Sequence, residues 1–181
     1  MNTKSKALKI GFNAVGFQSA WWLTVGGLVM GYPLLGPLAM TLYMITDHLT
    51  LTKKAQSEIR LILSAMLLGT IADTLFNVSG LISYAGGYSV APFLAPLWIT
   101  LMWGGFAATL NHSLSWIKPK PILGFIMGAI FGPLSYMAGA KFDALQFNMD
   151  MTLSLIILGL FWGISIPALV WLQNRFEGGS K

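Results

Sequence analysis

Six long apolar stretches constrain this chain more than any other feature of its sequence. They run over about residues 8–30, 34–51, 59–82, 93–116, 122–140 and 151–173. A membrane-spanning helix needs about 20 mostly apolar residues, because the hydrocarbon core is about 30 Å thick and a helix rises about 1.5 Å per residue. The sequence therefore predicts an all-α protein, a polytopic transmembrane helix bundle with about six spans.

The composition fits a protein that is surrounded by lipid. Of the 181 residues, 55% are hydrophobic and 9% are charged, whereas soluble domains average about 25% charged residues. The breaks between the apolar stretches are too short for another domain, so residues 1–181 are expected to form a single transmembrane domain. Cysteine is absent, which excludes disulfides, thiolate catalysis and thiolate metal ligands.

Lysine and arginine predict the orientation of the bundle, because the cytoplasmic loops of membrane proteins are enriched in these residues. With the amino terminus inside, ten of the eleven basic residues are cytoplasmic and only Lys141 lies outside. The ten are Lys4, Lys6, Lys9, Lys53, Lys54, Arg60, Lys118, Lys120, Arg175 and Lys181. Six spans then place both termini in the cytoplasm. Because this bias explains the net charge of +5, nucleic acid is not an expected partner.

Polar side chains near the cytoplasmic ends of three predicted spans form the first candidate site. Asn13, Asp47, His48, Asn111 and His112 all lie about 5 to 8 Å from that end, counted along their helices. They predict a polar pocket open to the inner leaflet, in which a histidine carries protons and Asp47 fixes its tautomer. The alternative is that these residues lie at the headgroup level and only form hydrogen bonds there.

Asp73 is the second candidate site, because it lies deep in the third span. It is about 20 Å from Arg60 along the helix, too far for easy snorkelling, so it needs a partner or a proton. Asn77 lies on the same helical stripe, and Gln18 at a similar depth is an expected hydrogen-bond partner. Asp73 then either couples protons or binds substrate, or it only holds helices together.

Cofactor and metal motifs are missing from the sequence. It has no Walker-type phosphate loop, no His-Glu-x-x-His motif and no Gly-x-Ser-x-Gly motif. A metal ion would need His48 and His112 together with Asp47 or Asp73, and the depths of these residues do not all agree. We therefore expect neither a cofactor nor a metal.

A stripe of small residues predicts close helix packing in the fifth span. Gly124, Gly128 and Gly132 recur at intervals of four, which lets a neighbouring backbone approach closely. That neighbour could belong to the same chain or to a second copy, so a homo-oligomer through the glycine stripe is one expectation. The other expected partners are the surrounding membrane lipids.

Several short motifs over residues 12–141 resemble an uncharacterised bacterial inner-membrane family that is catalogued only as a domain of unknown function. The motifs are Phe12-Asn13, Phe17-Gln18, Trp21-Trp22, Leu35-Gly36-Pro37-Leu38, Leu68-Gly69-Thr70 with Asp73, Ala95-Pro96-Leu97-Trp98, Thr109-Leu110-Asn111-His112-Ser113 and Gly132-Pro133-Leu134-Ser135-Tyr136. The resemblance implies a multi-pass protein of the bacterial inner (plasma) membrane. It supplies no catalytic or binding residues, and His48 lies outside the motifs.

Three functions remain open at this point. The first is handling of a small molecule or lipid at a site enclosed by the first four helices, with Asp73 and the Asn111-His112 pair. The second is a membrane-embedded lipid-modifying enzyme, in which His112 or His48 performs acid-base chemistry and Asp47 or Asp73 orients it. The third is a scaffold without a substrate. A packed interior that holds Asp73 in a closed hydrogen-bond network would indicate this function.

Overall fold

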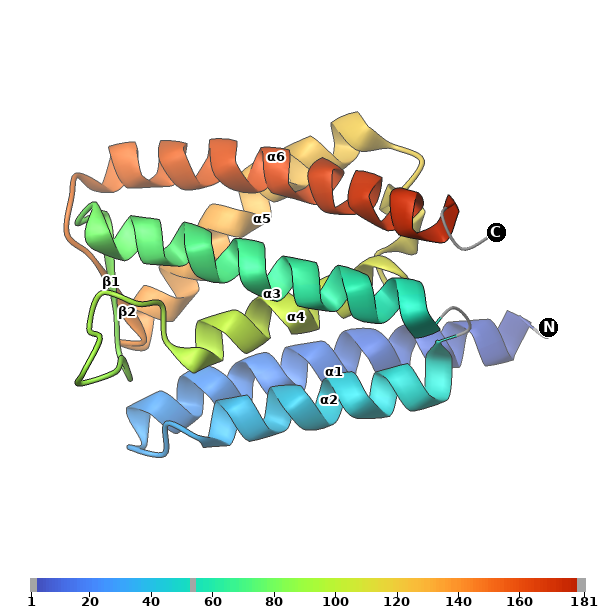
Figure 1. Ribbon diagram of the computed structural model, residues 1–181, viewed down its shortest axis with the longest axis horizontal. Coiled ribbons are helices and arrows are strands. Elements are labelled where there is room, and N and C mark those ends of the chain that lie inside the picture. Colours follow the sequence, from blue (N-terminus) through green and yellow to red (C-terminus); the bar gives the residue numbers. More distant parts are fainter. Residues whose placement is uncertain (1–2, 53–54, 179–181) are drawn as a thin grey trace.

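The structure is a computed structural model that describes residues 3–52 and 55–178, with side chains from residue 7 onward. The described chain forms a bundle of six α-helices with one two-stranded sheet (Figure 1). The helices are α1 (Thr3–Val29), α2 (Leu35–Leu51), α3 (Ala55–Val78), α4 (Leu97–Leu110), α5 (Pro121–Lys141) and α6 (Met151–Gly178). The short elements are β1 (Ile82–Tyr84), the 3₁₀ helix η1 (Ser115–Ile117) and β2 (Leu145–Phe147). The all-α fold class predicted from the sequence is confirmed.

Each predicted apolar stretch coincides with one helix, and three of the helices, α3, α5 and α6, are long and apolar enough to cross a membrane. The largest difference is in the fourth stretch, predicted over residues 93–116, because α4 has only 14 residues. It begins after the extended Pro96 and ends at Asn111. There the backbone N–H groups of His112 and Leu114 both donate to the Thr109 carbonyl, which closes a turn in place of further helix.

Both chain ends lie at the same end of the bundle (Figure 1). The last turn of α2, the first turn of α3 and the α4–α5 connection lie at that end too. This arrangement is the one that an even number of spans requires, and the orientation relative to the cytoplasm stays a prediction. Of the basic residues used to predict it, Lys53, Lys54 and Lys181 lie outside the described residues, as do the side chains of Lys4 and Lys6.

The opposite end of the bundle is joined by a short antiparallel sheet that the sequence did not indicate. Strand β1 pairs with β2 in the register Ile82 with Phe147 and Tyr84 with Leu145, which links the α3–α4 connection to the α5–α6 connection. The third stretch was predicted to stay helical to residue 82, but α3 ends at Val78. Gly80 adopts a φ of 75° and closes a Schellman motif there, so the chain leaves the helix before β1.

Glycines bring four helices together around two stacked tryptophans. The indole rings of Trp103 on α4 and Trp162 on α6 are parallel within 6°, with centroids 4.3 Å apart. Trp103 lies on Gly69 of α3 and Trp162 on Gly132 of α5, where an added Cβ would come within 2.0 Å and 2.4 Å of the respective indole. The predicted stripe on α5 thus packs against α6 of the same chain, and contact between copies stays a prediction.

Candidate functional site

Asp73, near the end of α3, is fully buried and has three hydrogen-bond donors. The hydroxyl groups of Tyr84 and Tyr136 each donate to Oδ1 at 2.6 Å. The indole Nε1 of Trp103 donates to Oδ2 at 2.7 Å. Asp73 itself has an exposed fraction of 0%. Both carboxylate oxygens are therefore bonded by neutral side chains from three other elements, β1, α4 and α5.

The local structure explains how these donors reach Asp73. Gly69 lies one turn before Asp73 on α3, and its missing side chain makes the space in which the Trp103 indole lies. Tyr84 is held by the pairing of β1 with β2. Burial, followed by the nearby Asp73, raises the pKa of the Tyr84 hydroxyl well above its usual value, so this group stays a proton donor.

The structure separates the residues that the sequence grouped with Asp73. Asn77 donates from Nδ2 to the carbonyls of Pro92 and Phe93, at 2.9 Å and 3.1 Å, and so holds the segment that precedes α4. Gln18 lies instead on the wall of a cavity. The sequence reasoning missed Tyr84, Tyr136 and Trp103 as the partners of Asp73, because nothing in their spacing shows that they point to one carboxylate.

A cavity of about 440 Å³ lies next to this cluster, between α1, α4, α5 and α6. Trp103 and Tyr136 form part of its wall, so the Asp73 carboxylate stands directly behind the lining. The other aromatic lining residues are Phe17, Trp21, Trp22, Trp98, Phe106, Phe131 and Trp162. Its volume falls within the range of about 300 to 1,000 Å³ that is typical of small-molecule sites.

Exposed side chains of two helices form the rim of this cavity. Trp22 on α1 is 50% exposed and Phe131 on α5 is 58% exposed, and Leu134 beside it is also half exposed. Phe131 lies ten residues from both ends of α5, or about 15 Å from either end. The cavity therefore opens on the side of the bundle, at the level of the hydrocarbon core if α5 spans the membrane.

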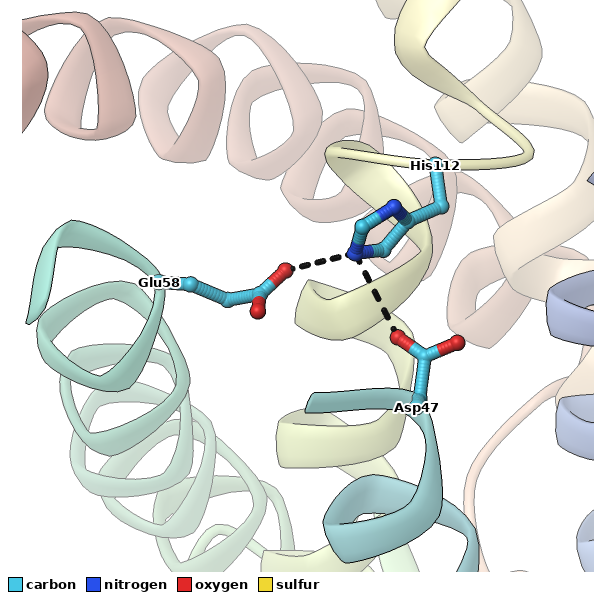
Figure 2. A group of neighbouring side chains, drawn as sticks. All are labelled: Asp47, Glu58 and His112. Atoms are coloured by element: carbon cyan, nitrogen blue, oxygen red, sulfur yellow. Dashed lines mark hydrogen bonds and ion pairs between the residues drawn. The ribbon is translucent and has the colours of Figure 1, made fainter. Parts of the chain in front are cut away.

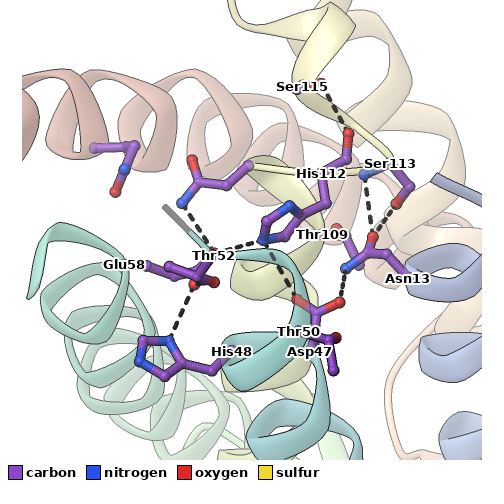
Figure 3. A network of polar contacts seen from close by, with 12 residues as sticks. Asn13, Asp47, His48, Thr50, Thr52, Glu58, Thr109, His112, Ser113 and Ser115 are labelled. Atoms are coloured by element: carbon purple, nitrogen blue, oxygen red, sulfur yellow. Dashed lines mark hydrogen bonds and ion pairs between the residues drawn. The ribbon is translucent and has the colours of Figure 1, made fainter. Parts of the chain in front are cut away.

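A second cluster of polar side chains lies at the end of the bundle that holds the chain termini, around Glu58 on α3 (Figure 3). Glu58 is buried, with 2% of its surface exposed. Its Oε1 lies 2.8 Å from Nε2 of His112, and its Oε2 lies 3.2 Å from Nδ1 of His48. Thr52 donates its hydroxyl hydrogen to the same Oε2. One carboxylate thus contacts both histidines of the chain.

Asp47 approaches the same imidazole from α2 (Figure 2). Its Oδ1 accepts a hydrogen bond of 2.9 Å from Nδ2 of Asn13, and its Oδ2 faces His112 Nε2 at 3.4 Å. Asn13 is fixed in turn, since its Oδ1 accepts hydrogen bonds from the backbone N–H and the hydroxyl of Ser113. His112 Nε2 consequently lies between two buried carboxylates that come from different helices.

A lysine, Lys118, lies at the edge of this cluster. Asn111 places its Nδ2 3.4 Å from Glu58 Oε1, and its Oδ1 accepts a hydrogen bond of 2.6 Å from Lys118 Nζ. Lys118 also lies 3.3 Å from Glu177 of α6. Asn111 therefore stands between the buried carboxylate and the lysine.

All five residues that the sequence placed at one level, Asn13, Asp47, His48, Asn111 and His112, meet in this cluster. The residue at its centre, Glu58, was missed. It lies one position before the predicted third span, between that span and a short polar break that contains two lysines. The sequence signal that could have identified Glu58 was an acidic residue at the end of one predicted span, with the two histidines at the ends of neighbouring spans.

Asp47, Glu58 and His112 each offer one potential metal-ligand atom, and these three atoms all lie within 4.8 Å of one another.

The two clusters are distinct sites. Trp103 contacts Asp73, whereas His112 contacts Glu58. Trp103 and His112 are nine positions apart in the sequence, or about 13 Å apart at the helical rise. The cavity lining includes neither histidine. The structure thus does not bring Asp73 and the Asn111-His112 pair into the single site that the first functional hypothesis assumed.

The apolar helices and the buried polar clusters define an integral membrane protein of unknown activity. The chain belongs to the family described as "Protein of unknown function (DUF2878)", whose sequence profile matches residues 10–168. The family resemblance noted from the motifs is therefore confirmed at the level of the family. No curated protein and no solved structure matches the chain.

Proposed function

We propose that this protein binds an apolar, membrane-soluble molecule, the acyl chain of a lipid or a free fatty acid, in the cavity between α1, α4, α5 and α6. The observation that carries this proposal is the aromatic cavity of about 440 Å³ whose rim includes Trp22 of α1 and Phe131 in the middle of α5. In this proposal the protein has six spans in the bacterial inner membrane and both termini in the cytoplasm. The ligand enters sideways from the lipid.

The cavity must recognise its ligand by shape and by a few polar contacts, because leaving lipid for an apolar cavity gains no hydrophobic free energy. Aromatic walls supply the shape. The indole Nε1 of Trp162 is buried beside the Tyr136 hydroxyl and has no hydrogen bond of normal geometry among the described residues. Because that donor is buried, the polar end of a ligand would instead meet Gln18 on the same wall, an exposed side chain that can donate or accept a hydrogen bond.

Asp73 supports this site from behind the wall. Its hydrogen bonds fix the side-chain positions of Trp103 and Tyr136, which line the cavity. A scaffold was expected to have both a closed hydrogen-bond network around Asp73 and a packed interior. The network is present, but a cavity lies beside it. We therefore assign Asp73 a positioning role in ligand binding.

Photolabelling tests this proposal. The full chain is placed in phosphatidylethanolamine and phosphatidylglycerol vesicles that contain a phospholipid with a photoreactive acyl chain. We expect saturable labelling of lining residues on α1 and α5. Ser135→Trp, which fills the cavity at a lining position, should reduce this labelling by about tenfold.

The matched control is Ile130→Trp on the same helix, at an exposed position that is not part of the lining. This variant should label like the wild type. Labelling that is spread evenly over the lipid-facing helices, or that is the same in both tryptophan variants, would contradict the proposal.

The second candidate function is a lipid-modifying enzyme. The observation that favours it is the position of His112 Nε2 between Glu58 and Asp47, a geometry that suits general acid-base chemistry. The test compares the lipids of a deletion strain after complementation with the wild-type or the His112→Ala gene. An enzyme predicts that one lipid class changes and that only the wild type restores it. Equal restoration by both genes would exclude His112 as the catalytic base.

A further inference from the structure

We propose that Asp47, Glu58 and His112 form a binding site for a divalent transition-metal ion. This inference concerns a different region from the lipid cavity and does not depend on it. The sequence argument against a metal rested on the depth of Asp73, which the structure replaces with Glu58 as the nearby carboxylate.

The distances fit the size of such a site (Figure 2). His112 Nε2 lies 2.8 Å from Glu58 Oε1 and 3.4 Å from Asp47 Oδ2, and the three ligand atoms all lie within 4.8 Å of one another. Ligand atoms about 2.1 Å from a tetrahedral zinc ion are about 3.4 Å apart. Small side-chain rotations would therefore suffice to place one ion among the three groups.

An oxygen atom of Asp47 points independently to a ligand. Asp47 is 1% exposed, and its Oδ2 is buried without a hydrogen bond of normal geometry among the described residues, although it faces His112. Asn13 already satisfies the other oxygen, Oδ1. A buried carboxylate oxygen without a donor is costly, and a cation at this point removes the cost.

Charge balance leads to the same conclusion. Asp47 and Glu58 are two buried carboxylates, and a metal-bound imidazole such as that of His112 must be neutral. Lys118, at the edge of the cluster, contacts Asn111 and Glu177. With His48 and His112 both neutral, the two carboxylates have no counterion among these contacts. A divalent cation would balance them, since removing water from carboxylates without a counterion is strongly unfavourable.

The surrounding residues already hold the three ligands in place. His48 and Thr52 contact the second oxygen of Glu58, and Asn13 anchors Asp47. The His112 carbonyl accepts a hydrogen bond of 2.7 Å from the Ser115 hydroxyl. Such outer contacts orient metal ligands in known sites.

The donor set selects the class of metal. Imidazole with two carboxylates suits Zn²⁺, Mn²⁺ or Fe²⁺, whereas Mg²⁺ and Ca²⁺ prefer all-oxygen sites. His112 and His48 are partly exposed, at 14% and 23% of their side chains, at the end of the bundle that carries both termini. An ion can therefore reach the site from water.

The experiment titrates Zn²⁺ into the chelator-treated full chain in lipid nanodiscs and measures bound metal by mass spectrometry and calorimetry. We expect about one Zn²⁺ per chain. Glu58→Gln and Asp47→Asn keep the side-chain shape and remove the charge, and each should weaken Zn²⁺ binding by at least about tenfold to a hundredfold. Asp143→Asn removes the charge of an exposed acidic residue at the far end of α5 and should bind like the wild type.

Co²⁺ binding gives a readout that does not depend on any variant. Bound by one nitrogen and two oxygen ligands, Co²⁺ in the wild-type protein should show visible absorption bands that are stronger than those of the hydrated ion. The proposal is wrong if the wild type takes up less than about one tenth of an equivalent of Zn²⁺, if Co²⁺ keeps the spectrum of the hydrated ion, or if folded Glu58→Gln retains wild-type affinity. Equal affinity for Mg²⁺ would overturn the assignment to a transition metal.

Discussion

Asp73 and Glu58 are both buried carboxylates on α3, yet their partners differ in kind. Asp73 accepts hydrogen bonds from two tyrosines and a tryptophan, which leaves neither of its oxygens without a donor. Glu58 contacts two histidines and lies near a second carboxylate whose Oδ2 lacks a donor. The first arrangement is complete within the chain, and the second has room for a charged ligand.

This difference follows the position of each acid along the helix. Asp73 is fifteen residues beyond Glu58, or about 22 Å further along α3, and it is fully buried five residues before that helix ends at Val78. In a hydrocarbon environment an acid persists only with full hydrogen bonding. Near water, imidazole and carboxylate groups can exchange protons or ions. The comparison therefore assigns a positioning role to the deep site and ligand exchange to the end site.

The largest effect is expected from Asp73→Ala. This change leaves three buried donors without an acceptor, each costing about 1 to 3 kcal/mol. The free energy of unfolding should fall by at least about 3 kcal/mol, measured by equilibrium unfolding in mixed micelles. Lys120→Ala on the surface is the control. A loss below about 1 kcal/mol would show that the deep network is not closed.

Metal binding should stabilise the end site by almost as much. Zn²⁺ at one hundred times its dissociation constant should raise the free energy of unfolding by about 2.7 kcal/mol. The same titration should raise the free energy of unfolding of Glu58→Gln by at most about 1.4 kcal/mol, because this variant lacks one carboxylate ligand and binds Zn²⁺ at least about tenfold more weakly. Equal stabilisation of both proteins would place the bound ion elsewhere and break the comparison.

Gly69→Ala tests the packing that supports the deep site. The added Cβ would come within 2.0 Å of the Trp103 indole and should move it away from Asp73, which we expect to cost about 1 to 3 kcal/mol. Gly26→Ala is a matched control in α1, where an added Cβ meets nothing within 4 Å. Equal stability of the two variants would show that Trp103 does not depend on this gap.

The smallest effect is expected from Tyr136→Phe. It removes one of the two hydrogen bonds to Asp73 Oδ1, and the Tyr84 hydroxyl still donates to that oxygen. We expect a loss of about 1 kcal/mol in the free energy of unfolding. A loss as large as that of Asp73→Ala would mean that Tyr136 alone maintains the network.

The sequence predicted the helices well because the length and apolarity of each stretch are local properties. It also placed Asn13, Asp47 and His112 at one level, since depth along a helix follows from residue counting. It could not identify Tyr84 as a partner of Asp73. Tyr84 reaches Asp73 only because β1 pairs with β2, a three-residue pairing between segments distant in the sequence.

Glu58 illustrates a second limit of sequence reasoning. Glu58 lies in the first turn of α3, so close to the end of the bundle that the sequence gives no reason to expect it to be buried. Its burial results from the packing of α3 against α4 and from the turn that carries His112. The cavity was equally inaccessible to prediction, because its walls are aromatic residues of several helices that the sequence gives no reason to distinguish from anchors or packing residues.

The central claim is that the chain holds a lipid-accessible cavity apart from its polar end cluster. An experimental structure of the full chain in lipid nanodiscs tests it most directly. We expect elongated density that enters between Trp22 and Phe131 and ends near Trp162, separate from Glu58 and His112. A bundle in which aromatic side chains close this space, with no density in it, would show that the protein has no such cavity.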